Sequence, residues 1–172
     1  MALKNFFEFN FKSLKHFLNQ DLEIEEKKIP MRSKQIWQSV YKKGSFEINN
    51  LTTFPLELRS KLNGLISLDK PKIIKTQTSD DGTIKWLIKL FDGNEVECVY
   101  IPEKTRATLC ISSQVGCTLN CRFCHTGTQR LVKNLSFAEI INQVMIAKEQ
   151  LYDWGEQKKI TNIVLMGMGE PF

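Results

Sequence analysis

The chain has 172 residues with an apolar fraction of 42%, enough for one hydrophobic core or two small ones. It contains no apolar run near the roughly 20 residues that a membrane helix needs, and its start lacks the pattern of a secretory signal. Five cysteines, an odd number, favour a reducing compartment over a disulfide framework. We therefore expect a cytoplasmic protein without membrane contact.

The net charge of +5 is unevenly distributed along the chain. Residues 1–80 hold 14 lysines and arginines against 9 acids, whereas residues 81–172 hold 10 of each. A basic segment joined to a neutral one fits a nucleic-acid-binding module fused to a module that performs chemistry. The alternative is that the lysines only keep the surface soluble.

Residues 1–66 predict a small helical domain, basic in character. Within residues 3–20 the apolar positions recur with helical spacing and form one stripe of an amphipathic helix. These positions are Phe7, Phe11, Leu14 and Leu18. We interpret them as core positions and not as a membrane anchor.

Two further helices are expected in the same domain. Residues 32–43 predict one of them, with Ser33 as a candidate cap and Gly44 able to end it in a left-handed conformation. Pro55, at a first-turn position, predicts the start of the other, and Gly64 lies near its end.

The period of the sequence changes to that of strands in residues 67–103, which predict a β-meander acting as a connector. Asp-Gly pairs at 81–82 and 92–93 are strong hairpin signals between the strands. The three expected strands are residues 72–78, 83–91 and 95–101.

Residues 104–172 predict a strand–helix–strand unit. Residues 107–112 form a short apolar strand, and Ser136 with Glu139 makes a capping box that opens a helix. Residues 160–166 are largely apolar, as in strands buried in a parallel sheet. Together these segments indicate one βαβ unit.

Three cysteines, Cys117, Cys121 and Cys124, stand at the spacing C-x3-C-x2-C between that first strand and the helix. Iron–sulfur clusters normally take four cysteine ligands, so a compact group of three suggests that another molecule completes the site. S-adenosylmethionine, a cofactor of radical chemistry, can do so through its amino and carboxylate groups. The alternatives are zinc, with His125 as a fourth ligand, or free thiols.

The second predicted strand ends in the turn Gly167–Pro171. Ligands of α/β folds bind at the carboxyl ends of strands, and the cysteine loop follows the neighbouring strand end. Glycines let a backbone approach a ligand closely, and Glu170 can pair with an ammonium group. The turn and the cysteines therefore predict one shared site.

These residues resemble the radical S-adenosylmethionine superfamily. In particular, the run from Arg106 to Cys117 and the Gly-Met-Gly-Glu-Pro turn resemble the dual-specificity 23S rRNA and tRNA adenine-C2 methyltransferases. Residues 100–103, 130–135 and the Lys34–Trp37 helix extend the resemblance over the whole chain. It implies an α+β N-terminal part, with helical domain and meander, followed by the first strand, helix and second strand of an incomplete (β/α) partial barrel in residues 104–172.

The resemblance also implies roles for particular residues. Cys117, Cys121 and Cys124 correspond to ligands of a [4Fe–4S] cluster, and Gly169 and Glu170 correspond to contacts of S-adenosylmethionine. Glu97 stands at the position of the proton acceptor, and Cys110 at that of the cysteine forming a transient disulfide. The residues alone favour an exposed strand carboxylate for Glu97 and a small core residue for Cys110, and only the resemblance assigns them catalytic roles.

In the resembled family a cysteine is methylated first. A 5′-deoxyadenosyl radical from a second S-adenosylmethionine then activates that methyl group for addition to C2 of adenine. The implied partners are 23S rRNA, tRNA and an electron donor for the cluster. Family members are about twice as long and carry the methyl-accepting cysteine downstream, so we expect this chain to be inactive alone and to need a complementary C-terminal fragment. The alternative is an RNA-binding module with a vestigial or zinc-occupied cysteine site.

Overall fold

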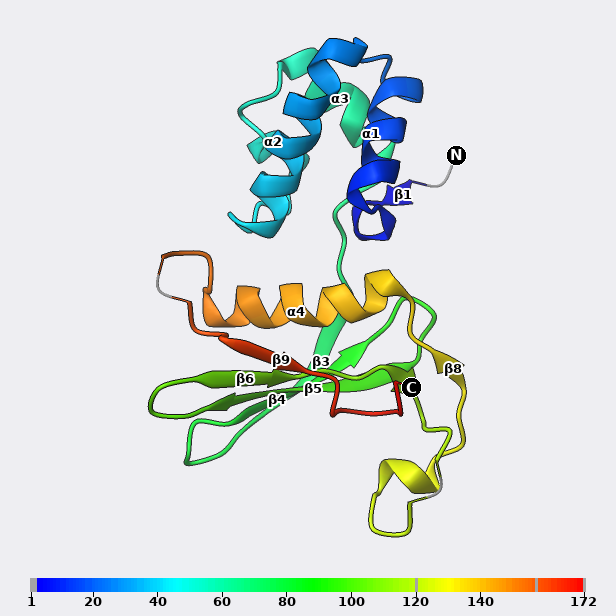
Figure 1. The fold of residues 1–172 in the computed structure, drawn as a ribbon, viewed down its shortest axis with the longest axis vertical. Coiled ribbons are helices and arrows are strands. Elements are labelled where there is room, and N and C mark those ends of the chain that lie inside the picture. The colour runs from blue at the N-terminus through cyan, green and yellow to red at the C-terminus, as the bar shows by residue number, and fades with distance from the viewer. Residues whose placement is uncertain (1–2, 120, 157, 172) are drawn as a thin grey trace. The chain divides into compact units, whose positions relative to one another are not determined.

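The computed structural model describes residues 3–119, 121–156 and 158–171. They form a mixed α/β structure that divides into two compact units, Met1–Asp69 and Lys70–Phe172 (Figure 1). No helix within these described ranges is long and apolar enough to cross a membrane.

The first unit is helical, as predicted, with one short parallel strand pair. Its helices are α1 (Phe11–Gln20), α2 (Ile29–Tyr41) and α3 (Leu56–Asn63). Strand β1 (Lys4–Asn5) pairs with β2 (Ile66–Ser67). Short 3-10 helices are η1 (Phe6–Glu8), η2 (Glu26–Lys28) and η3 (Ile48–Asn50). Large apolar side chains fill its core, among them Phe6, Phe7, Leu14, Phe17, Leu18, Ile36, Phe54 and Leu62.

The helix predicted within residues 3–20 starts only at Phe11, so the first half of that prediction is wrong. Asn10 caps α1, because its side-chain oxygen accepts hydrogen bonds from Lys12 N (2.9 Å) and Ser13 N (2.8 Å). Phe7 lies in η1 and is fully buried. The apolar spacing was correct about the burial of Phe7, Leu14 and Leu18, but it was wrong about Phe11, which is 37% exposed, and about the backbone before that residue.

Helix α2 begins three residues earlier than predicted, and Ser33 is not its cap. The Ser33 hydroxyl lies inside the helix and donates to Ile29 O at 2.5 Å. Pro30 occupies the first turn, where its missing N–H is harmless. The predicted end is confirmed, because Gly44 has φ = 65° and donates to Val40 O at 3.2 Å.

The second unit is built on a five-stranded sheet in the order β3-β4-β5-β6-β9. Its strands are β3 (Lys72–Thr78), β4 (Ile84–Lys89), β5 (Glu95–Pro102), β6 (Ala107–Cys110) and β9 (Asn162–Val164). The first four are antiparallel, and β9 runs parallel to β6. Gly82 and Gly93, with φ of 83° and 89°, confirm the two Asp-Gly turns. The strands of the expected connector, residues 67–103, thus share one sheet with those that follow.

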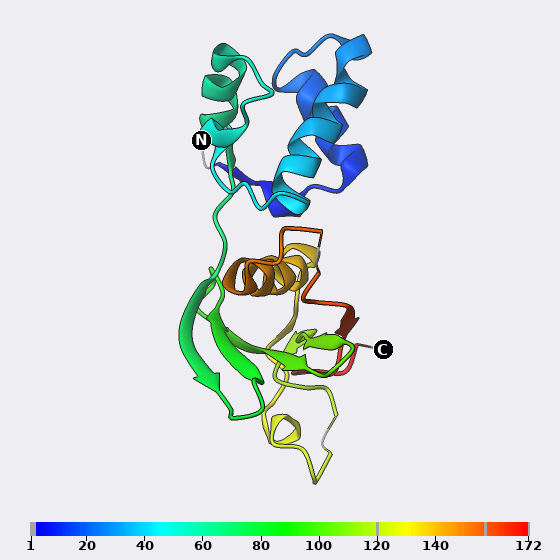
Figure 2. The same ribbon diagram turned by 90° about the vertical axis from the view of Figure 1, so that its left-hand side faces the viewer.

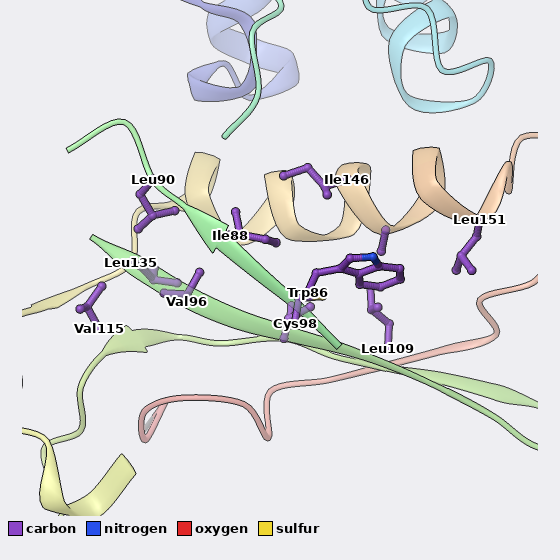
Figure 3. Packing of buried hydrophobic residues seen from close by; sticks show 12 residues of the cluster. Trp86, Ile88, Leu90, Val96, Cys98, Leu109, Val115, Leu135, Ile146 and Leu151 are labelled. Atoms are coloured by element: carbon purple, nitrogen blue, oxygen red, sulfur yellow. The ribbon is translucent and has the colours of Figure 1, made fainter. Parts of the chain in front are cut away.

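Helix α4 (Phe137–Leu151) lies along one face of this sheet (Figures 1 and 2). Ser136 and Glu139 form the predicted capping box, in which Ser136 N donates to the Glu139 carboxylate at 2.8 Å. Figure 3 shows the side chains of the strands and of α4 meeting in one apolar layer around Trp86, which is 1% exposed. This burial is the main stabilising term of the unit.

Strand β9 differs from the buried strand predicted for residues 160–166. It has only three residues, and Ile163 and Met166 are 52% and 78% exposed. The parallel pairing with β6 is confirmed. Among the described residues β9 has a neighbouring strand on one side only, which is why its apolar side chains remain exposed.

Candidate functional site

Two segments meet at the carboxyl ends of the parallel strands β6 and β9. The cysteine loop follows β6, and the turn Gly167–Pro171 follows β9. Ser113 N and Gln114 N both donate to Met168 O, at 2.8 and 3.1 Å, and Gly167 N donates to Ile111 O at 3.0 Å. The structure therefore brings the turn against the residues that lead into the cysteine loop.

Both glycines of the turn are required by its contact with the chain after β6. A Cβ atom on Gly169, which has φ = 102°, would lie 2.5 Å from Gln114 Cβ. A Cβ atom on Gly167 would lie 2.8 Å from the Ile111 carbonyl. The sequence predicts that these glycines let the backbone approach a ligand, and the structure shows that they also allow the two chain segments to pack.

The cysteine loop extends away from the sheet (Figures 1 and 2). It leaves the sheet through β7 (Gln114–Val115), contains the turn η4 (Thr126–Thr128) and returns through β8 (Lys133–Asn134), which pairs with β7. Gly127 packs on the Cys121 backbone so closely that a Cβ atom would lie 2.7 Å from Cys121 O. The loop thus depends on backbone packing more than on apolar burial.

Backbone N–H groups already point at two of the three sulfur atoms in this loop. Leu119 N donates to Cys117 Sγ at 3.3 Å. The Gly127 N–H, followed by the N–H and hydroxyl of Thr126, lowers the pKa of the Cys124 thiol, because these donors stabilise the thiolate. Thiolates are the form that binds metal.

The three thiols fit an iron–sulfur cluster by their chemistry but are not gathered as metal ligands. Among the described residues no group of three or more Cys, His, Asp or Glu side chains is close enough to hold a metal ion. All five cysteines, each of which the structure describes, are free thiols. Three partly exposed thiols within one short loop have the chemistry that suits three irons of a cubane, but in this structure they do not share one metal site.

Glu97 and Cys110 lie on the face of the sheet that α4 does not cover. Val99 pairs with Cys110 across β5 and β6, so Glu97, two residues before Val99, shares that face. Lys85 Nζ lies 2.9 Å from Glu97 Oε1, a partner that the sequence argument missed. The two candidate catalytic side chains are therefore neighbours on one open surface.

The two cysteines of the sheet differ in environment. Burial raises the pKa of the Cys98 thiol to about 12, and its side chain packs beneath α4. Burial also raises the pKa of Cys110, with the Met166 N–H acting in the opposite direction. Cys110 is partly accessible and Cys98 is not, so only Cys110 is placed to react.

Three polar residues that the sequence argument overlooked hold the site together. Gln143 of α4 accepts from Ser112 N (2.8 Å) and donates to Ser112 O (2.9 Å). The Ser112 hydroxyl accepts from Met168 N (2.9 Å) and donates to Glu97 O (2.6 Å). Gln114 Oε1 accepts from Glu170 N at 3.0 Å. For Ser112 and Gln114 the available signal was the polar run Ser112–Gln114 at the end of an apolar strand, whereas no such signal marked Gln143.

A hollow of about 460 Å³ lies beside this arrangement. Its polar lining includes Thr118 from the cysteine loop and Glu170 from the turn, with Gln114 between them. The hollow thus adjoins both sequence-predicted parts of the site.

No protein-family model matches the chain. It is 50% identical over 153 residues to "Dual-specificity RNA methyltransferase RlmN" of Rhodopseudomonas palustris strain BisB5, covering 82% of this chain and 38% of that protein. It is 47% identical over 163 residues to the RlmN of Bradyrhizobium sp. strain ORS 278, covering 88% of this chain and 40% of that protein.

Its structure is similar to the crystal structure of a radical SAM methyltransferase from Sphaerobacter thermophilus, with a TM-score of 0.83 and 32% identity, over 98% of this chain and 48% of that one. The chain spans about two fifths of the length of the curated relatives it matches. Sequence and structure agree on one group of proteins, and the chain belongs to the RlmN family, whose N-terminal part it represents.

Proposed function

We propose that these 172 residues are the cluster-binding and RNA-binding part of a radical S-adenosylmethionine methyltransferase that modifies C2 of adenosine in 23S rRNA and in tRNA. The observation that carries the proposal is the junction at the carboxyl ends of β6 and β9, where the cysteine loop and the turn Gly167–Pro171 meet. The methyltransferase names of the relatives support the reaction class. In this proposal β6, α4 and β9 begin a partial (β/α) barrel that further residues complete.

Each candidate residue has a role in this proposal. Cys117, Cys121 and Cys124 would hold a [4Fe–4S] cluster, which when bound supplies the electron for reductive cleavage of S-adenosylmethionine. Gly169 and Glu170 would contact the amino group of that cofactor at the open edge of β9. An electron donor is a required partner.

The open face of the sheet would carry the proton and thiol chemistry. Glu97, held by Lys85 on that face, accepts the proton that leaves the adenine ring. Cys110, partly accessible on the same face, would form the transient disulfide with a methyl-carrying cysteine outside these 172 residues. Ser112 ties both parts together, since it contacts the Glu97 carbonyl and the Met168 N–H.

Iron content tests the cluster. Anaerobic reconstitution of the wild-type chain with iron and sulfide is expected to give about four irons per chain, because three clustered thiolates can anchor a cubane. Cys121→Ala is expected to abolish uptake, whereas Cys98→Ala, the same change at a buried core thiol, should retain it. Stoichiometric zinc in anaerobically purified protein, with no cluster on reconstitution, would instead support an RNA-binding module with a zinc-occupied site.

The lysines of the first unit test RNA binding. Its arginines are occupied with backbone carbonyls: Arg32 donates to Thr53 O at 2.7 Å and Arg59 to Asn49 O at 2.6 Å. Lys34, Lys42 and Lys43 are exposed and, within the described parts of the chain, form no ion pair. These three lysines are therefore available to contact phosphate.

Neutralising Lys34, Lys42 and Lys43 to Gln is expected to weaken binding to structured RNA and to flatten its salt dependence, because fewer counterions are released. The matched control neutralises Lys27, Lys28 and Lys61, which already pair with Glu25 and Glu57. Equal losses of RNA affinity in the two triple variants would show that net charge alone drives binding.

Product analysis tests the reaction. With 23S rRNA, reductant and labelled S-adenosylmethionine, the 172 residues alone are expected to give no 2-methyladenosine. Orientation of reacting groups is worth roughly 7–11 kcal/mol of barrier, and the residues that would orient the adenine are not supplied. Adding the remaining part of a relative should give the product. Product from this chain alone would contradict the division of roles.

A further inference from the structure

We propose that Gln114 is a positioning residue that couples the cysteine loop to the turn Gly167–Pro171, so that ordering of one segment orders the other. The proposal rests on the proposed function, because it concerns the segments assigned there to the cluster and to S-adenosylmethionine. Gln114 was not among the candidate residues of the sequence argument.

One side-chain amide joins three segments of the chain. Gln114 Oε1 accepts from Glu170 N at 3.0 Å and from Thr118 N at 3.3 Å. Gln114 Nε2 donates to Asn134 Oδ1 at 2.8 Å. Thr118 is adjacent to the first cysteine of the loop, and Glu170 is the acid of the turn. The amide therefore bridges the two halves of the proposed site directly.

Several contacts keep this amide in one orientation. Gln114 is only 5% exposed, although its functional group is polar. Its backbone N–H donates to Met168 O, and Gly169 packs against its Cβ and Cγ atoms. Asn134, its cross-strand partner in the β7–β8 pair, fixes the donor end. A displacement of either the loop or the turn must therefore disturb the amide.

Glutamine meets the chemical requirement of this position better than other residues of its size. Two N–H donors converge on one carbonyl oxygen, which has two lone pairs, while the NH2 group meets an acceptor. Leucine has a similar volume but would leave both N–H groups without their acceptor, and buried or part-buried donors without partners are unfavourable. The consequence falls on Thr118 and Glu170 together.

Amide hydrogen exchange of the full 172-residue chain, followed by mass spectrometry, tests the coupling. In the metal-free chain, Gln114→Leu is expected to accelerate exchange at Thr118 and at Glu170 together, each roughly tenfold, a factor equivalent to about 1.4 kcal/mol. Asn134 is exposed, and Asn134→Ala removes only the acceptor that holds the Gln114 side-chain amide. This variant should produce a smaller acceleration of exchange at the same two sites.

Gln143→Leu is the matched control, since it removes a second buried amide that contacts neither Thr118 nor Glu170. It should lower overall protection without selecting these two sites. After reconstitution with iron and sulfide, the wild-type chain is expected to gain protection in residues 166–171. The Gln114→Leu chain should bind the same amount of iron but show no added protection in residues 166–171. A residue with a merely structural role would not change this response to the metal.

Two results together would overturn the coupling. In Gln114→Leu, exchange at Thr118 and Glu170 would be unchanged or would rise unequally. In Asn134→Ala, exchange at the same two sites would be unchanged. Equal protection of the turn in reconstituted wild-type and Gln114→Leu chains would overturn it as well. The metal-free measurements do not depend on a cluster. Absence of iron uptake by the wild-type chain would therefore contradict the proposed function, while the metal-free arm still decides the role of Gln114.

Discussion

The apolar core of the second unit and its cysteine loop are stabilised in different ways. In the core, Trp86 and its neighbours are almost fully removed from water between the sheet and α4. In the loop, Phe123 is 94% exposed, and order comes from backbone hydrogen bonds and from glycines packed on the chain. The comparison teaches that apolar burial stabilises the sheet and α4 without a ligand, whereas in the proposed function the loop reaches its metal-binding geometry only when the metal binds.

The largest effect is expected from a change that damages only the loop. Gly127→Ala should abolish iron uptake, because its Cβ would lie 2.7 Å from Cys121 O and must displace Cys121, which we propose as a cluster ligand. Gly155→Ala, where a Cβ meets nothing within 4 Å, is the control. Iron analysis after reconstitution measures the outcome. Normal iron content in Gly127→Ala would mean that the loop rearranges freely.

The reverse change damages only the core. Trp86→Ala is expected to lower the free energy of unfolding by about 3–5 kcal/mol, since it removes a fully buried aromatic side chain and leaves a cavity. Denaturant unfolding of the metal-free chain measures it. Phe91, which is 65% exposed, supplies the control substitution Phe91→Ala. Similar losses of unfolding free energy in Trp86→Ala and Phe91→Ala would contradict the assignment of the core.

A smaller effect is expected at the start of α4, where the core and the loop adjoin. Ser136→Ala removes the side-chain oxygen that accepts from Glu139 N at 3.3 Å and should cost about 1 kcal/mol of stability. Ser136→Asp, which keeps a capping oxygen, should restore most of it. Equal unfolding midpoints for Ser136→Ala and wild type would mean that the cap contributes little here.

The smallest effect concerns acid stability. Hydrogen bonding to Lys133 lowers the pKa of Asp92 to about 2. Because the ordinary value is near 4, this pairing stabilises the fold above about pH 4, and the contribution disappears as pH falls through about 2. Asp92 is partly exposed, so the effect should stay below about 1 kcal/mol.

Unfolding measured from pH 2 to pH 7 should show a flatter acid dependence for Asp92→Asn than for wild type. Asp80→Asn removes the same charge at an exposed residue of the preceding hairpin and is the control. An identical acid dependence for wild type and Asp92→Asn would assign the acid sensitivity to other carboxylates.

Much of the fold was predictable because its signals are local. The Asp-Gly turns, the Ser136 capping box and the glycine after α2 were all confirmed, since each depends on a few neighbouring residues. The start of α1 was missed, although Asn10 offered a cap signal, because apolar spacing continued through η1. The predicted burial of β9 was also wrong, because the exposure of its side chains depends on which strands lie beside it.

The sequence by itself determined the chemistry that this chain offers: three closely spaced thiols, a glycine-rich turn, and a carboxylate and a thiol on two successive predicted strands. Only the tertiary structure decided how they meet. It placed Lys85 beside Glu97, put Cys110 on the open face, and joined the loop to the turn through Gln114. The physical reason is that the spacing of residues along the chain sets which of them share a local turn or one face of a helix or strand. Hydrogen bonds between segments about fifty residues apart arise only when strand pairing brings their ends together.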